Sequence, residues 1–147
     1  MKSTPVSDKN SIKQLKDFLR INKLPVEDLD DEKLNHESFF LYKKDDGNLI
    51  GSGGLEFYGS SALIRSVAVD SSLRGMQYGQ QIVYDLKKRA MQQGSTSMYL
   101  LTETAPDFFS KNGFEKIDRD DAPEELKSSS EFSHMCPTTA VCMKLDL

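Results

Sequence analysis

The stretch RSVAVDSSLRGMQYGQQIVYDLKKRAMQQG, residues 65–94, contains a strand signal, a turn and a helix signal in one run. Its β-branched segment stops before Arg74 and Gly75, and after a second glycine, Gly79, the pattern becomes that of a long amphipathic helix. A helix that begins just after a glycine-containing loop presents unpaired backbone N–H groups and a positive dipole end. Together with the charge of Arg74, these features predict an anion site suited to phosphate.

Two common phosphate loops do not fit this turn. The sequence has no G-x-x-x-x-G-K-[ST] motif, and its glycine spacing is not G-x-G-x-x-G. The pattern therefore disfavours both a nucleotide hydrolase and a Rossmann-type dehydrogenase.

Length and composition narrow the classes further. A chain of 147 residues is the usual size of one domain, so residues 1–147 are expected to form a single domain. A formal charge of -4 argues against a nucleic-acid binder. There is no apolar run long enough for a membrane span and no signal-peptide pattern, so we expect a cytoplasmic protein that interacts with neither nucleic acid nor membrane. In that compartment Cys136 and Cys142 should be reduced.

Periodicity and turn signals predict an α+β domain around a mixed sheet. The expected helices cover residues 8–21, 77–93 and 106–112, with shorter helical turns in 26–34 and 123–126. The expected strands are 38–44, 49–59, 62–69, 98–101, 114–117 and 136–145. The helix 77–93 should end at Gly94 in a left-handed cap. Its buried face should carry Tyr78, Ile82, Val83, Leu86, Ala90 and Met91.

The segment V-A-V-x4-R-G-x-x-Y-G resembles motif A of the GNAT acetyltransferases, R-x-x-G-x-G/A, with Arg74 and Gly79 in place and Gln77 where the middle glycine is usual. Downstream, TETAPDFFSKNGF resembles motif B, with Thr102 in place of the usual asparagine and Phe109 in place of the usual tyrosine. Ala105, Gly113 and Phe114 match that motif. The segments GLEFYGSSALIRSVAV, MYLLTETAPDFFSKNGF and EFSHMCPTTAVCM further resemble the arsenic-resistance branch, which is close to amino-acid N-acetyltransferases.

The resemblance implies an α+β fold with a mostly antiparallel central sheet flanked by helices. It also implies an N-acetyltransferase in which a free amine attacks the thioester of acetyl-CoA directly, with no metal. The cofactor-binding residues that it implies are Val67, Ala68, Val69, Arg74, Gly75, Met76, Gln77, Tyr78, Gly79, Gln80, Thr102 and Phe109. Homodimers are frequent in this family. His134 and Cys136, at H-x-C spacing, are too few for a zinc site.

Removing the amine's proton calls for a carboxylate. Glu56, on the strand before the cofactor strand, is the first candidate base, and a solvated strand glutamate is the alternative reading. Glu103 is the second candidate, with a surface loop charge as its alternative. Because Phe109 has no hydroxyl, the leaving thiolate takes its proton from Tyr84, Thr102, Tyr99 or solvent, or needs none.

Arg65 is unusual in the otherwise apolar strand LIRSVAV, where a buried charge is costly unless it is paired. It sits two positions before Val67, which on a regular strand places both on one face. One reading is a fork that grips the carboxylate of an amino-acid acceptor, with Glu56 beside it in the substrate site. The other is a structural pair with Glu56 across the hairpin.

Two functions remain open from the sequence. The first is an acetyl-CoA-dependent N-acetyltransferase acting on a small amino-acid-like amine. The second is a non-catalytic CoA-binding sensor or subunit of the same fold, which the departures at Gln77 and Phe109 keep in play.

Overall fold

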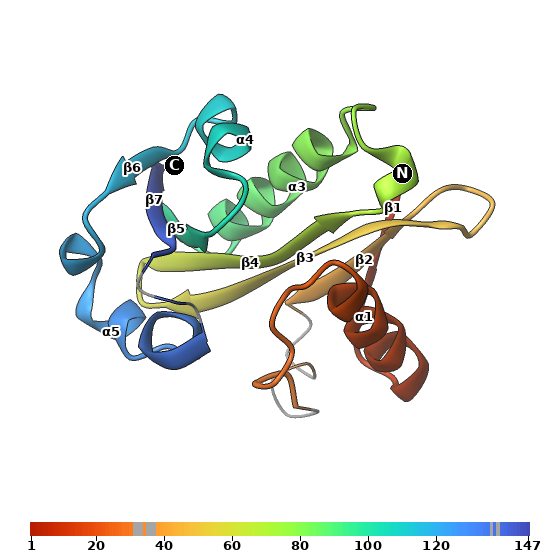
Figure 1. Ribbon diagram of the computed structural model, residues 1–147, viewed down its shortest axis with the longest axis horizontal. Coiled ribbons are helices and arrows are strands. Elements are labelled where there is room, and N and C mark those ends of the chain that lie inside the picture. Colours follow the sequence, from red (N-terminus) through yellow and green to blue (C-terminus); the bar gives the residue numbers. More distant parts are fainter. Residues whose placement is uncertain (31–33, 35–37, 136, 138) are drawn as a thin grey trace. The chain divides into compact units, whose positions relative to one another are not determined.

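The computed structural model describes residues 1–30, 34, 38–135, 137 and 139–147 (Figure 1). Its strands are β1 (Lys2–Pro5), β2 (Phe39–Lys43), β3 (Leu49–Tyr58), β4 (Ser61–Val69), β5 (Ser97–Thr102), β6 (Glu115–Ile117) and β7 (Val141–Asp146). Its helices are α1 (Lys9–Ile21), α3 (Tyr78–Gln92), α4 (Pro106–Lys111) and α5 (Glu124–Lys127). Short helical turns are η1 (Ser71–Leu73), η2 (Arg119–Asp121) and η3 (Glu131–Met135).

The strands form a seven-stranded sheet in the order β1-β2-β3-β4-β5-β7-β6. The pairs β1–β2, β2–β3, β5–β7 and β6–β7 are antiparallel, and β4 runs parallel to β5. The α+β class and the mostly antiparallel sheet predicted from the sequence are confirmed.

The chain folds into two compact units. The first contains residues 1–55 and 66–86, and the second contains residues 56–65 and 87–147. Strands β3 and β4 and helix α3 each contribute residues to both units.

In the first unit, α1 begins at a capping box in which Asp8 accepts a hydrogen bond from the Ser11 backbone N–H. Its buried side chains recur at helical spacing, as the sequence predicts, and they are Ile12, Leu15, Phe18 and Leu19. Three of them join a core with Phe39 and Leu41 of β2. Helix α1 therefore covers one face of this part of the sheet (Figure 1).

The glycines of β3 let its two faces pack closely. A Cβ at Gly51 would overlap the Ala68 carbonyl of β4, and one at Gly53 would lie 2.8 Å from a methyl group of Leu86 in α3. A Cβ at Gly54, on the opposite face, would overlap the ring of Phe39. The missing side chains thus allow β4 to lie close beside β3 in the sheet, α3 to pack on one face of β3, and Phe39 to pack on the other.

We expect Gly51→Ala to lower the free energy of unfolding by about 1–3 kcal/mol, because the new methyl group meets a backbone carbonyl that cannot rotate away. Gly53→Ala is the matched control, since the atoms nearest its new methyl group are methyl carbons of the Leu86 and Ile82 side chains and not backbone atoms. Urea denaturation of both variants measures the difference. Equal losses at the two positions would contradict the expectation.

Helix α3 confirms most of its predicted face. Ile82, Val83, Leu86 and Ala90 are fully buried, and Gly94 follows the helix with φ +86°. Met91 was predicted on this face, and that prediction is wrong: its side chain is 57% exposed. Successive residues are about 100° apart around an α-helix, so position 91 lies well outside the stripe that positions 82, 83, 86 and 90 form, and the helical period itself places Met91 on the exposed side.

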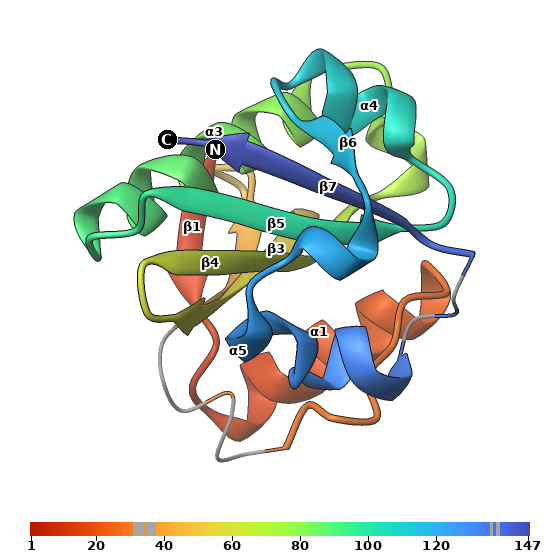
Figure 2. The ribbon, with the colours of Figure 1, turned by 90° about the vertical axis from the view of Figure 1, so that its left-hand side faces the viewer.

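In the second unit, β7 pairs with β5 from Ser97↔Asp146 to Thr102↔Val141 and carries β6 on its other edge (Figure 2). Side chains from these strands and from the short helices form its core. They are Leu63, Tyr99, Ala122, Leu126, Phe132 and Cys142. The register of β4 with β5 runs from Ser61↔Ser97 to Leu63↔Tyr99.

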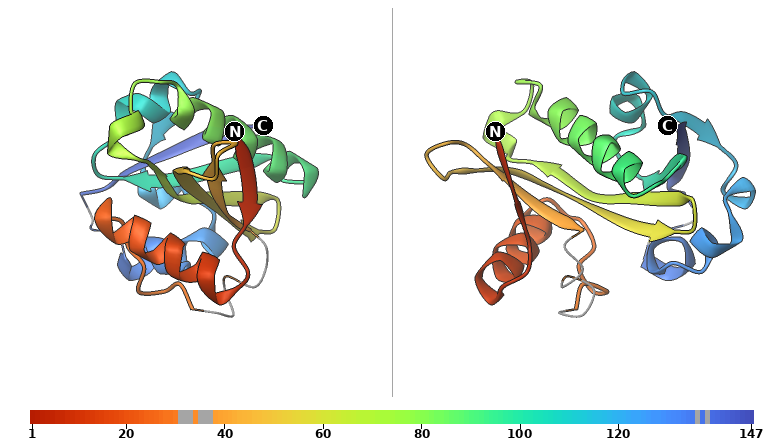
Figure 3. Two further views of the ribbon diagram at one scale, coloured as in Figure 1. Left: turned by 90° about the vertical axis from the view of Figure 1, so that its right-hand side faces the viewer. Right: turned by 180° about the vertical axis from the view of Figure 1, so that it is seen from behind.

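The sequence patterns differ from the structure at both ends of the described chain. Strand β1 was not predicted; it pairs with β2 at the edge of the sheet and is mostly exposed, so it carries no apolar alternation (Figure 3). The last strand begins at Val141. Before it, the Ala140 N–H donates to the Pro137 carbonyl in a turn, and residues 136 and 138 of the predicted strand lie outside the described residues. Of the helical turn predicted in 26–34, residues 31–33 lie outside the described residues; positions 27 and 28 form a turn and Leu34 is helical.

No helix in the described part of the chain has the length and apolar character that crossing a membrane requires.

Candidate functional site

The turn between β4 and α3 is built by short-range polar contacts. Asp70 caps η1 by accepting hydrogen bonds from the Ser72 backbone N–H at 2.9 Å and from its hydroxyl at 2.6 Å. These bonds hold the pKa of Asp70 below its usual value, with smaller contributions from the charges of Arg74 and Lys44. The Asp70 carboxylate therefore stabilises the turn by capping η1.

The backbone of this turn is left-handed at two residues before α3. Gly75 has φ +83° and Gln77 has φ +68°. A left-handed conformation suits glycine and costs other residues about 1–2 kcal/mol. Gln77 thus adopts a conformation that a glycine at this position of the motif would take easily.

Helix α3 then begins with its N–H groups directed back at this turn. The Gln81 N–H donates to the Gln77 carbonyl at 3.2 Å, so the preceding N–H groups of Tyr78, Gly79 and Gln80 come before the helical ladder. Unpaired N–H groups at a helix N-terminus, with the positive end of its dipole, form a site for an anion.

Arg74 brings a guanidinium group to the same turn. Its side chain is exposed, with Nε donating to the Val69 carbonyl at 3.4 Å and Nη2 donating to Oδ1 of Asn22 at 3.1 Å. The structure therefore places the predicted residues 74–80 in one cationic turn of the first unit.

The strand that precedes the turn is irregular at Ser66. This residue has φ +58° in the middle of β4, and its carbonyl accepts a hydrogen bond from the buried hydroxyl of Ser52 at 2.7 Å. Its conformation interrupts the side-chain alternation, so the expectation that Arg65 shares a face with Val67 does not follow from their spacing. Beyond it, Val67 and Val69 are partly exposed and Ala68 is buried.

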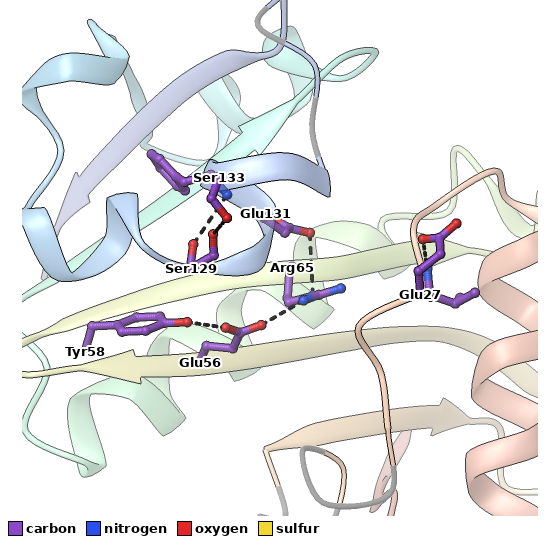
Figure 4. Close-up of polar contacts among 9 residues, drawn as sticks. Glu27, Glu56, Tyr58, Arg65, Ser129, Glu131 and Ser133 are labelled. Carbon is purple, nitrogen blue, oxygen red and sulfur yellow. Dashed lines mark hydrogen bonds and ion pairs between the residues drawn. The ribbon is translucent and has the colours of Figure 1, made fainter.

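A buried polar cluster lies in the second unit (Figure 4). Nη1 of Arg65 contacts Oε2 of Glu56 at 2.8 Å, and its Nε lies 3.5 Å from Oε1 of Glu131. The Tyr58 hydroxyl donates to the other oxygen of Glu56. The pair between Arg65 and Glu56, one of the two readings of the sequence, is present in the structure.

Burial sets the chemistry of this cluster. The Arg65 side chain is 0% exposed, so its charge depends on the two carboxylates that face it. Burial and the hydrogen bond to the Glu56 carboxylate raise the pKa of Tyr58 well above its usual value of 10, which keeps its hydroxyl a neutral donor. Glu56 thus lies between a permanent cation and a neutral hydroxyl.

The remaining predicted residues lie at the end of β5 and on α4. Glu103 is exposed just after β5. The Thr102 hydroxyl accepts a hydrogen bond from the Ala105 N–H at 3.1 Å. Phe109 is buried and packs edge-to-face on Phe108 and Phe114, with ring centroids 5.0 and 5.7 Å away.

Sequence reasoning did not identify Tyr58, Glu131 or Asn22. Tyr58 is two residues after Glu56 on β3, so strand alternation offered a signal for it. Glu131 and Asn22 reach their partners only through the tertiary fold, and no local pattern marks them.

The described residues show no group of three or more potential metal ligands. Cys142 is a free, buried cysteine, and burial raises the pKa of its thiol to about 11, so it stays protonated at neutral pH. Cys136 and the side chain of His134 lie outside the described residues.

Several solved structures share this fold. The N-acetylglutamate synthase of Neisseria gonorrhoeae, in complex with coenzyme A and N-acetyl-glutamate, aligns with a TM-score of 0.80 and 18% identity over 99% of this chain and 35% of that chain. Rv2747 of Mycobacterium tuberculosis, in complex with CoA and NLQ, aligns with a TM-score of 0.78 and 23% identity over 100% and 99% of the two chains. A GNAT-family acetyltransferase from Staphylococcus aureus Mu50 aligns at 0.75, with 21% identity over 99% and 98%.

The chain thus spans about a third of the synthase and nearly the whole of the other two proteins. At 18–23% sequence identity, these alignments show that the chain shares the fold of the three proteins. No curated protein sequence matches this chain. The pattern of the acetyltransferase (GNAT) family, whose members bind CoA and transfer acyl groups to amines, matches residues 11–114. This match covers more than half of the sequence and includes the cationic turn, and the chain therefore belongs to the acetyltransferase (GNAT) family.

Proposed function

We propose that residues 1–147 act as one acetyl-CoA-dependent N-acetyltransferase domain whose acceptor is a small amino-acid-like amine. The observation that carries this proposal is the cationic turn, in which left-handed Gly75 and Gln77 lead into the N-terminus of α3 beside Arg74. This arrangement suits the pyrophosphate of CoA.

The cofactor would be held by this turn and by the strand before it. The N–H groups of Tyr78, Gly79 and Gln80 and the guanidinium of Arg74 would bind the pyrophosphate. Val67, Ala68 and Val69 would pair through their backbone with the pantetheine arm, and a main-chain N–H there would polarise the thioester carbonyl. The hydroxyl of Ser52, by holding the Ser66 carbonyl, would fix where this segment begins.

The reaction needs a route for one proton. The acceptor nitrogen attacks the thioester carbon, the C–S bond breaks, and the amine's proton goes to a base as CoA leaves with the bonding electrons. We assign the base role to Glu56, acting directly or through water, because it is a carboxylate on β3 held in place by two donors. Glu103, exposed at the end of β5, is the alternative base.

The acceptor is assigned by the chemistry of Arg65. A guanidinium fork recognises a carboxylate, which favours α-amino acids and their phosphinate or arsinate analogues. Two structural neighbours were solved with N-acetyl-glutamate and with NLQ, which is consistent with an amino-acid acceptor. In the free protein Arg65 already faces Glu56 and Glu131, so an acceptor carboxylate would have to share or replace one of these partners.

Release of CoASH from acetyl-CoA, measured with a panel of amines, tests this function. We expect turnover with α-amino acids or their analogues and little with polyamines or lysine peptides. Amidation of the acceptor's carboxylate should raise its KM about ten- to a hundredfold, as for loss of a charge-assisted pair. Better turnover with spermine would refute the acceptor class. Binding of CoA without turnover on any amine would favour a sensor or subunit.

A further inference from the structure

The end of helix α1 meets the cationic turn at Asn22. This residue is the C-cap of α1, and its side-chain N–H donates to the Phe18 carbonyl at 2.8 Å. Its Oδ1 accepts from Nη2 of Arg74 at 3.1 Å. Residues that are 52 positions apart in the sequence are thereby joined within the first unit.

The two bonds of Asn22 fix the direction in which its amide points. With the NH₂ group committed to the Phe18 carbonyl, the oxygen is the atom turned toward the guanidinium. The opposite orientation would set two donors against each other. An asparagine is suited to this position because it supplies a donor to the helix end and an acceptor to the arginine.

The backbone around Asn22 holds it firmly. Lys23 takes a left-handed conformation with φ +60°, and the Leu24 N–H donates to the Leu19 carbonyl at 2.9 Å, which closes the helix end. Leu19 is buried in the core that α1 shares with β2, and Leu24 packs against that core. The carboxamide is therefore presented by an anchored turn.

Arg74 benefits from such an anchor because it is exposed. A free arginine side chain samples many rotamers and loses that freedom when it binds an anion. Two acceptors, the Val69 carbonyl and Asn22 Oδ1, hold the guanidinium over the turn before any ligand arrives. An uncharged acceptor does this without neutralising the charge that an anion needs.

We propose that Asn22 is a positioning residue for the cofactor: it preorganises Arg74 for the diphosphate of acetyl-CoA. This inference rests on the proposed function of the turn. It assigns a role in cofactor binding to the end of α1, outside the residues 67–80 that the motif marks.

Binding of CoA to the purified protein, measured by titration calorimetry, tests the inference. Asn22→Ala should weaken CoA binding about three- to tenfold, the loss expected for one neutral hydrogen bond. The KM for acetyl-CoA should rise to the same extent while kcat at saturating acetyl-CoA stays unchanged. Asn22→Asp should weaken binding further, because a carboxylate would neutralise Arg74 beside the ligand's phosphates.

Asn112→Ala is the matched control. Asn112 caps α4 in the second unit, and its side-chain N–H donates to the Phe108 carbonyl at 2.8 Å, as Asn22 does to Phe18. It should show a similar loss of thermal stability and no change in CoA affinity. A loss of CoA affinity in Asn112→Ala as large as in Asn22→Ala would reduce the effect at Asn22 to one of general stability.

A double-mutant cycle with Arg74→Ala isolates the coupling. If Asn22 acts through Arg74, Asn22→Ala should have almost no further effect in the Arg74→Ala background. Fully additive losses, or unchanged affinity in Asn22→Ala alone, would overturn the inference and leave the proposed function standing. Unchanged affinity in Arg74→Ala would instead overturn the proposed cofactor turn, and the inference with it.

Discussion

Glu56→Gln should lower kcat by about a hundredfold or more while the affinity for acetyl-CoA stays unchanged, as expected when a general base is lost. Glu56 is bound by Tyr58 and Arg65, and the proposed cofactor contacts come from residues 67–80, so the affinity for CoA should not depend on the Glu56 carboxylate. Steady-state rates at saturating acetyl-CoA, with calorimetric titration of CoA, separate the two quantities.

The rate defect of Glu56→Gln should depend on pH in a defined direction. The acceptor attacks only as a free amine, and a base is needed most where the amine is protonated. As the pH rises through the pKa of the amine, an increasing fraction is deprotonated without help. The rate defect of Glu56→Gln should therefore shrink toward high pH, and a defect that is the same at every pH would argue against a base.

Tyr58→Phe provides the matched control for Glu56→Gln. It removes the hydrogen bond that the Tyr58 hydroxyl donates to Glu56 but leaves the carboxylate. It should therefore lower the free energy of unfolding and change kcat little. A hundredfold loss in Tyr58→Phe as well would mean that the cluster acts only by supporting the fold. Full activity in Glu56→Gln, with a loss in Glu103→Gln, would move the base role to Glu103.

The sequence predicted secondary structure correctly where the local residue pattern matches the packing of the folded protein. Helices α1 and α3 were predicted to within a residue or two because each carries a buried stripe at helical spacing, and Gly94 also marked the end of α3. The turn at Arg74 was predicted for the same reason, since glycine positions are visible in the sequence. Strand β1 was not, because its pairing with β2 uses backbone groups that every residue has.

The buried cluster shows why the rest of the candidate site was harder to predict from the sequence. Strand spacing allowed a pair between Arg65 and Glu56, and the structure contains it. The second carboxylate, Glu131, comes from a helical turn far along the chain, where nothing in its neighbours marks it as buried. The left-handed Ser66 was hidden as well, because serine gives no signal for such a conformation.

Arg65→Ala should lower the free energy of unfolding by about 3–5 kcal/mol, the loss typical when one partner of a buried ion pair is removed. The variant leaves Glu56 and Glu131 buried without the cation that faces both. The exposed pair of Arg20 and Asp17 is a control in the same protein: its side chains are 59% and 48% exposed, and Arg20→Ala should cost less than about 1 kcal/mol. Urea denaturation measures both.

The double variants decide what this loss means. If Arg65 is held by its two carboxylates, adding Glu131→Gln to Arg65→Ala should recover part of the stability, because one buried negative charge is removed. Arg65→Lys should be intermediate, since an ammonium group cannot span both carboxylates as a guanidinium fork does. A change below about 1 kcal/mol in Arg65→Ala would contradict this expectation. Such a small change would mean that the guanidinium contributes little to the stability of the folded state and serves instead to bind the acceptor's carboxylate. The loss of stability in Arg65→Ala therefore distinguishes a structural role of Arg65 from a role in recognising the acceptor.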